Sequence, residues 1–285
     1  EMVAMVSDLF RNLADIAPVI VVAGNHDMNL ANTNRMDALS PIVDNLNHPN
    51  LHYLKDSGIY KFGNVEVGVY SILGDRADWP QLSNYSSGDK VGIYHGPING
   101  AKTDTGHIMT GNYVDIDQFD GLDILMLGDI HKFQVMKNKN PVAVYAGSLL
   151  QQNHGELLEG HGWIEWDLLT KTFIHHELEN DYGYATVTLT DTNIQVPKLP
   201  KNVHLRIMTE NVDASVVKKF LSVLKVKHNV NVLDVAVNKS KAADVEATEA
   251  QQDAFNINDI SCQNKLIREY IEQNYPQTAS EVIDK

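Results

Sequence analysis

Three short apolar runs in this chain each end beside residues that can bind metals or protons, and this repeated layout restricts the fold more than any other feature. The first run, residues 17–23 (APVIVVA), is followed by Gly24, Asn25, His26 and Asp27. A short, uninterrupted and β-branched run is typical of a strand buried on both faces in a layered α/β sheet. Ligands gather at the carboxyl ends of such strands, so we expect the three polar residues at the rim of a site. Taken alone, the segment is equally compatible with an ordinary polar turn.

Two later runs repeat the layout. Residues 91–94 (VGIY) lead into His95, and residues 122–127 (LDILML) lead through a glycine to Asp129 and His131. The nitrogen and oxygen donors of Asn, His and Asp suit manganese, zinc or iron. Asp129 and His131 would project the same way from an extended backbone and could approach one metal cluster together. A single strand end of this kind favours a structural turn, whereas three of them favour a metal site.

The rest of the chain suggests a modular organisation. Residues 2–16 carry apolar side chains at three-and-four spacing and predict an amphipathic helix that leads into the first strand. We expect one α/β domain over residues 1–178 and a smaller α+β domain over residues 181–237. Residues 238–256 are polar and predict a linker, and residues 257–285 predict a helical segment with an apolar stripe.

Composition narrows the classes of protein. No apolar run is long enough to cross a bilayer, no signal peptide is visible, and the single cysteine, Cys262, cannot form an internal disulfide. We therefore expect a cytoplasmic protein with no membrane partner. The formal net charge of −14 disfavours nucleic-acid binding by bulk electrostatics alone. A local basic patch could offset it, although an ordinary solvated helix face explains the same residues: Lys198, Lys201, Arg206, Lys218, Lys219, Lys225 and Lys227.

The motifs resemble those of a known family. Gly24-Asn25-His26-Asp27, His95-Gly96 and Gly128-Asp129-Ile130-His131, in this order, resemble the third, fourth and fifth motifs of the calcineurin-like metallophosphoesterases. Further similarity lies in Tyr145-Ala146-Gly147-Ser148, Gly155-Glu156 and Gly160-His161-Gly162-Trp163, which resemble the segment that closes the nuclease domain of SbcD-type proteins. These are bacterial and phage relatives of the meiotic-recombination-eleven nuclease. The resemblance covers nearly the whole chain and is densest over residues 17–167.

The resemblance implies an α/β fold in which a layered β-sandwich metallophosphoesterase domain, flanked by helices, carries a smaller α+β capping domain. It implies a hydrolase, namely a metal-dependent exonuclease and endonuclease subunit that cleaves DNA phosphodiester bonds in repair, recombination or replication. The implied cofactors are two divalent ions, manganese first and magnesium as the alternative. The implied partners are DNA and an SbcC-like or Rad-fifty-like ATPase, whose coiled coil would bind residues 257–285. The alternative for that segment is packing on its own domain, and a homodimer is left open.

Roles follow from the resemblance position by position. Asn25 and His95 would bind one metal, and His131 would bind the other. His26 would be the catalytic histidine beside the scissile phosphate, where it stabilises or protonates the leaving group. Asp27 is expected to orient His26 by a hydrogen bond rather than to touch a metal.

Two departures from the family pattern qualify these roles. Most relatives have Gly-His-x-His in the fifth motif, and here Asp129 replaces the first histidine. An aspartate still donates an oxygen, so we expect Asp129 to remain a ligand in a set that favours manganese or magnesium. The first two motifs, an Asp-x-His and a Gly-Asp, would precede Gly24, and residues 1–23 contain neither of them. We expect a segment of a longer protein, and weak metal binding and activity in this polypeptide alone.

Two alternative functions are kept. One is a metallophosphoesterase that acts on small phosphoesters or cyclic nucleotides, and the other is an inactive scaffold that docks DNA or the ATPase. Outside the strand-end pattern, His154 and His161 are expected to pack on the surface or in loops rather than to bind metal, although their position beside Gly155-Glu156 makes them the nearest of these histidines to a substrate. Lys132 is expected either to reach a phosphate or to be solvated.

Overall fold

The computed structural model divides the chain into two compact units, Glu1–Asn238 and Lys239–Lys285. The predicted linker (238–256), the predicted helical segment (257–285) and Cys262 lie outside the described residues. The first unit has a mixed α/β architecture with several sheets and few helices, which confirms the α/β class. In the described part, no helix is both long and apolar enough to cross a membrane. The described residues are 2–28, 32, 35–86, 88–190, 193–210 and 212–237.

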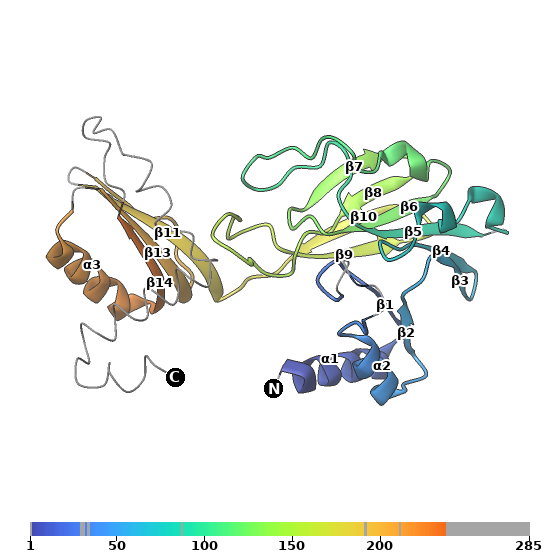
Figure 1. Ribbon diagram of the computed structural model, residues 1–285, viewed down its shortest axis with the longest axis horizontal. Helices are drawn as coiled ribbons and strands as arrows, with labels where there is room; N and C mark the ends of the chain where they lie inside the picture. Colours follow the sequence, from blue (N-terminus) through green and yellow to red (C-terminus); the bar gives the residue numbers. More distant parts are fainter. Residues whose placement is uncertain are drawn as a thin grey trace, which may run out of the picture. The chain divides into compact units, whose positions relative to one another are not determined.

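The largest sheet among the described residues has six strands, in the order β3-β4-β5-β6-β8-β7 (Figure 1). Its strands are β3 (Gly58–Phe62), β4 (Val65–Tyr70), β5 (Asp89–His95), β6 (Ile124–Gly128), β7 (Gln134–Asn138) and β8 (Val142–Tyr145). Strands β4, β5, β6 and β8 are parallel, and β3 and β7 run antiparallel at the two edges. The apolar runs predicted as the second and third buried strands become β5 and β6, in the interior of the sheet, where both faces are covered.

The first predicted strand belongs to a separate, two-stranded sheet. Strand β1 (Val19–Val22) pairs in parallel with β2 (Leu51–Leu54). All four residues of β1 are half-buried, so the prediction of a strand buried on both faces is wrong. Ile20 and Val22 pack against a core cluster that includes Val67 and Val69 of β4. Because β1 pairs with a single strand, β2, its other side chains are covered incompletely. The helices near this pair are α1 (Met2–Ile16), as predicted, and α2 (Ser40–Leu46).

The main hydrophobic core packs against β5, β6 and β8 of the six-stranded sheet. It joins Tyr94, Leu125 and Tyr145 from β5, β6 and β8 to Phe119, which ends a short 3-10 helix, η3 (Ile116–Phe119). Two further 3-10 helices, η1 (Arg76–Asp78) and η2 (Leu82–Asn84), lie in the connection before β5. Because Leu125 and Tyr145 are fully buried, the strands that carry the predicted site residues are anchored in this core.

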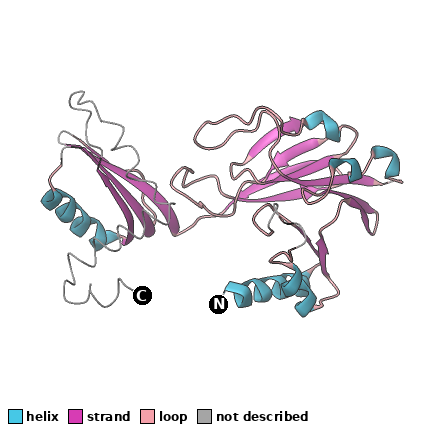
Figure 2. Cartoon of the chain, in the orientation of Figure 1, coloured by secondary structure: helices cyan, strands magenta, loops and turns pink. Residues whose placement is uncertain are grey.

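The remaining strands form two antiparallel or mixed sheets. Strands β9 (Gly162–Asp167) and β10 (Thr172–Glu177) pair as a hairpin. A four-stranded sheet follows in the order β12-β11-β13-β14, and helix α3 (Ala214–Lys227) lies along one of its faces (Figure 2). The compact unit Glu1–Asn238 includes this sheet, so the predicted division into domains over residues 1–178 and 181–237 stays a prediction. The strands of the sheet are β11 (Tyr182–Thr190), β12 (Ile194–Gln195), β13 (Asn202–Glu210) and β14 (Asn229–Val237).

Candidate active site

A cleft of about 870 Å³ is lined by residues at the ends of the three predicted strands. Strands β5 and β6 are parallel neighbours, and their register places His95 opposite Gly128 at the carboxyl end of both. The turn after β1 lies against the same end, where Asn25 contacts His95. All six residues selected from the sequence line the cleft, namely Asn25, His26, Asp27, His95, Asp129 and His131.

Three potential metal donors meet in this cleft. Oδ1 of Asn25 lies 3.1 Å from Nε2 of His95, and Oδ1 of Asp129 lies 3.7 Å from the same nitrogen. Two donors that bind one ion at about 2.1 Å and at angles of 90–110° are about 3.0–3.4 Å apart. The spacing and the donor types therefore fit a divalent ion after a small adjustment. Within the described residues, no three His, Cys, Asp or Glu side chains gather in a metal-binding group, so the third donor here is the amide of Asn25.

Glycines and a buried tyrosine determine where His95 lies. A Cβ on Gly24 would lie 3.0 Å from Cε1 of His95, and a Cβ on Gly128 would lie 2.8 Å from its Nδ1. The backbone that follows His95 is fixed by Tyr145, whose hydroxyl donates to the Gly96 carbonyl at 2.7 Å and accepts from the Ile98 N–H at 3.0 Å. The two glycines are thus required because the imidazole ring fills the space beside them.

Burial lowers the pKa of His95, and the nearby carboxylates of Asp129 and Asp27 oppose this effect only in part. A lowered pKa favours the neutral ring, which is the form of histidine that binds metals. Asp129 adopts a φ of 93°, a backbone conformation that residues other than glycine, asparagine and aspartate rarely adopt. Its carboxylate thus reaches His95 from a strained position directly after β6.

The turn after β1 is closed by Asp27. Its carboxylate accepts a hydrogen bond from the Gly24 N–H at 2.7 Å, and its own N–H donates to the Gly24 carbonyl at 3.2 Å. His26, between these contacts, is exposed and lines the cleft. The structure thus gives Asp27 a role in fixing the turn, and its expected hydrogen bond to His26 stays a prediction.

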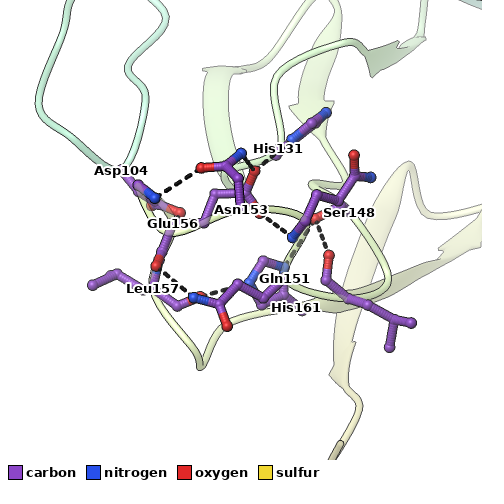
Figure 3. Close-up of polar contacts among 11 residues, drawn as sticks. Asp104, His131, Ser148, Gln151, Asn153, Glu156, Leu157 and His161 are labelled. Atoms are coloured by element: carbon purple, nitrogen blue, oxygen red, sulfur yellow. Dashed lines mark hydrogen bonds and ion pairs between the residues drawn. The ribbon is translucent and has the colours of Figure 1, made fainter. Parts of the chain in front are cut away.

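A loop after β8 holds His131 in place (Figure 3). The Nδ1–H of His131 donates to Oε1 of Glu156 at 2.8 Å, and Glu156 also accepts from the Gln152 N–H and from the Asn153 side chain. The side chain of Glu156 is only 8% exposed, so these hydrogen bonds replace the water that its carboxylate loses on burial. With Nδ1 engaged, Nε2 is the nitrogen of His131 that is left for a ligand in the cleft. Glu156 was not among the predicted site residues, although the Gly155-Glu156 pair was part of the family resemblance.

The same loop is secured at its base. The hydroxyl of Ser148 lies 2.9 Å from Nδ1 of His161, and the Nε2–H of His161 donates to the Leu157 carbonyl at 2.7 Å (Figure 3). His161 is buried, so the prediction that it packs in a loop is confirmed. Lys132 is partly exposed, and its Nζ lies 3.4 Å from Oδ1 of Asp104, so a contact of Lys132 with phosphate stays a prediction.

Comparisons with known proteins give one viral relative. The chain is similar to an uncharacterized protein of Acanthamoeba polyphaga mimivirus, with 42% identity over 221 residues. The match covers 74% of this chain and 16% of the viral protein, so the chain spans about a sixth of that relative's length. No family model matches the chain.

Proposed function

We propose that this chain is part of a metal-dependent phosphodiesterase of the calcineurin-like type, namely an SbcD-like DNA nuclease with a sandwich domain and a capping domain. One observation carries the proposal. The polar residues at the carboxyl ends of β1, β5 and β6 lie in a single cleft. There, Nε2 of His95 lies 3.1 Å from Oδ1 of Asn25 and 3.7 Å from Oδ1 of Asp129. A strand-end cleft with nitrogen and oxygen donors and an exposed histidine suits hydrolysis of a phosphodiester.

Each residue has a role that its contacts support. Asn25, His95 and Asp129 would hold one divalent ion, and His131, oriented by Glu156, would hold a second. Manganese, or magnesium as the alternative, would polarise the phosphate and lower the pKa of a bound water. The exposed His26 would donate a proton to the leaving oxygen.

DNA and an ATPase are the proposed partners. On α3, Lys218, Lys219 and Lys225 are exposed and could contact phosphates. In contrast, Lys198 is hydrogen-bonded to Glu159, and Lys201 lies 3.9 Å from Asp181. The basic surface proposed for DNA is therefore the exposed face of α3. Residues 257–285 would bind a Rad-fifty-like ATPase, and the complex would act in the cytoplasm.

A non-catalytic scaffold is the second candidate. It is favoured by the donor set, since no group of three or more His, Cys, Asp or Glu side chains comes together among the described residues. A metallophosphoesterase for small phosphoesters explains the cleft equally well but gives no role to the four-stranded unit.

The test is a histidine substitution in the full-length protein that contains this chain. We expect Mn²⁺-dependent cleavage of DNA, and we expect His26→Ala to lower the rate by at least about a hundredfold while Mn²⁺ binding is retained. His107→Ala is the matched control, because His107 is exposed and lies outside the cleft. Undiminished cleavage by His26→Ala would refute the catalytic assignment. Metal binding without any cleavage by the wild-type protein would favour the scaffold.

A further inference from the structure

The cleft contains one apolar segment within an otherwise polar lining. Leu149 and Leu150 both line it, and their side chains are 55% and 47% exposed. Single exposed leucines are common on protein surfaces, but two adjacent ones inside a cleft point to a ligand with an apolar part. None of the catalytic or metal-binding roles proposed above uses them.

Hydrogen bonds on both sides hold this apolar segment in place. On one side, Ser148 donates its backbone N–H to the His131 carbonyl at 3.1 Å and its hydroxyl to the Leu150 carbonyl at 2.8 Å. On the other side, the Gln151 side chain donates to the Glu156 carbonyl at 2.8 Å and accepts from the Tyr184 N–H at 2.6 Å. Ser148 and Gln151 are buried, so the loop is anchored at both ends while the two leucines are exposed between them.

A polar group lies next to the leucines. Gln152 is exposed and lines the cleft, while its backbone N–H donates to Oε2 of Glu156 at 2.7 Å. A glutamine side chain both donates and accepts hydrogen bonds, and an amide of this kind can pair with the edge of a nucleobase. Leucine side chains, for their part, can cover the flat apolar face of a base. An acyl chain would match the leucines but would make no hydrogen bond to the amide.

On these grounds, and resting on the nuclease function proposed above, we propose that Leu149, Leu150 and Gln152 form a nucleobase-binding wall beside the scissile phosphate. The wall is connected to the metal side of the cleft through the hydrogen bond between Ser148 and His131. In a duplex, each base face is covered by its neighbour, whereas a single strand offers its faces for stacking. The substrate at this position is therefore a strand whose bases are unstacked, and the cleft distinguishes it from a small phosphoester.

The experiment measures binding rather than cleavage. The full-length protein, in EDTA, is titrated with a single-stranded oligonucleotide that contains 2-aminopurine, and with an oligonucleotide of equal length whose central bases are replaced by abasic sites. Leu149→Ser/Leu150→Ser is expected to weaken binding of the first about tenfold and of the second less than about twofold. Gln152→Ala is expected to weaken binding about threefold, with a dependence on the identity of the base. The fluorescence of 2-aminopurine should rise on binding, because the base leaves the stack of its neighbours, and this rise should be smaller in the double variant.

Leu169→Ser is the matched control, since Leu169 is 89% exposed in the turn between β9 and β10 and does not line the cleft. Equal losses on both oligonucleotides, or no loss, would overturn the proposal. The proposal would also be overturned if the wild-type protein bound phosphatidylglycerol vesicles and the double variant lost this binding but retained oligonucleotide binding. The proposed nuclease function fails separately, if the wild-type protein binds the oligonucleotide through the wall but cleaves no DNA with Mn²⁺.

Discussion

The two sides of the cleft are supported in different ways. His95 is the last residue of β5, and Asp129 directly follows β6. Both strands lie in the interior of the six-stranded sheet, where Val91 and Leu125 are 2% and 0% exposed. Asn25 to Asp27 follow β1, which has one neighbouring strand and is half-buried throughout. Similar sequence patterns, an apolar run and then polar residues, thus produce a rigid support on one side and a weaker one on the other.

This difference indicates how the site is held together. On the β5–β6 side, backbone pairing and the core fix the donors before any ligand binds. On the β1 side, the turn depends on local contacts, such as the Asp27 carboxylate on the Gly24 N–H, and on the contact between Asn25 and His95. Few buried apolar contacts mean a low local stability, so we expect the β1 side to open first.

The largest effect is expected from alanine at the two glycines that face His95. In Gly128→Ala, the new Cβ lies 2.8 Å from Nδ1 of His95, and both strands are fixed, so the ring must move out of place. We expect Mn²⁺ affinity of the full-length protein, measured by isothermal titration calorimetry, to fall about a hundredfold. In Gly24→Ala, the nearest contact is 3.0 Å and the β1 turn can shift, so a loss of about tenfold is expected.

Gly74→Ala is the control for this pair, because its Cβ would meet nothing closer than 3.9 Å. Equal losses in the two glycine variants would show that the β1 turn is as rigid as the central sheet. The comparison between the two sides of the cleft would then be wrong.

Much of this arrangement follows from local sequence patterns. The apolar runs that become β5 and β6 are short, continuous and followed by His95 and Asp129, so periodicity and position suffice to place these residues at one sheet edge. The incomplete burial of β1 could not be predicted in this way. It depends on how many strands pair with β1, which is decided by distant parts of the chain and not by its own β-branched residues.

The loop contacts were also beyond prediction, for a related reason. Glu156 lies 25 positions after His131, and Lys132 lies 28 positions after Asp104, so neither pairing leaves a periodic signal in the sequence. Nothing in the residue types alone separates Glu156 from an ordinary surface glutamate. Its burial under the Asn153 and Gln152 contacts is a property of the folded loop.

An intermediate effect is expected at Glu156, because His131 lies three residues beyond β6 and is held by a loop rather than by a strand. Glu156→Ala removes the acceptor that fixes the His131 ring and leaves loop donors without a partner. We expect Mn²⁺ affinity to fall about thirtyfold, with a smaller loss in Glu156→Gln, which keeps one acceptor oxygen. The ¹⁵N chemical shifts of His131 should report a mixture of tautomers in Glu156→Ala alone.

Glu159→Gln serves as the control for Glu156, since its side chain is 67% exposed and does not contact His131. If Glu156→Ala retains the wild-type affinity and a single tautomer, the loop does not hold His131. His131 would then be fixed by β6 in the same way as Asp129.

The last effect concerns the stability of the β1–β2 side and depends on pH. The buried Asp37 carboxylate accepts hydrogen bonds from Lys55, which follows β2, and from Ser40, which begins α2, at 2.8 and 2.7 Å. Burial by itself would raise the pKa of Asp37, but the hydrogen bonds from Lys55 and Ser40 outweigh it and hold the pKa well below its ordinary value. Its stabilising contribution is therefore present above pH about 4 and is lost as the pH falls through the lower pKa of the folded state.

We expect Asp37→Asn to lower the free energy of unfolding by about 2 kcal/mol at pH 7, because the amide cannot replace a carboxylate that accepts from Lys55 and Ser40. The gap between wild type and variant should narrow as the pH falls below about 4, since protonation removes the same charge from the wild type. Urea denaturation at several pH values measures the gap, and Asp44→Asn, an exposed position on α2, is the control. In Asp37→Asn, hydrogen exchange of the backbone amides should become faster in β1 and β2 and stay unchanged in β5 and β6. An equal increase in β5 would contradict the division of the cleft into a weak and a rigid side.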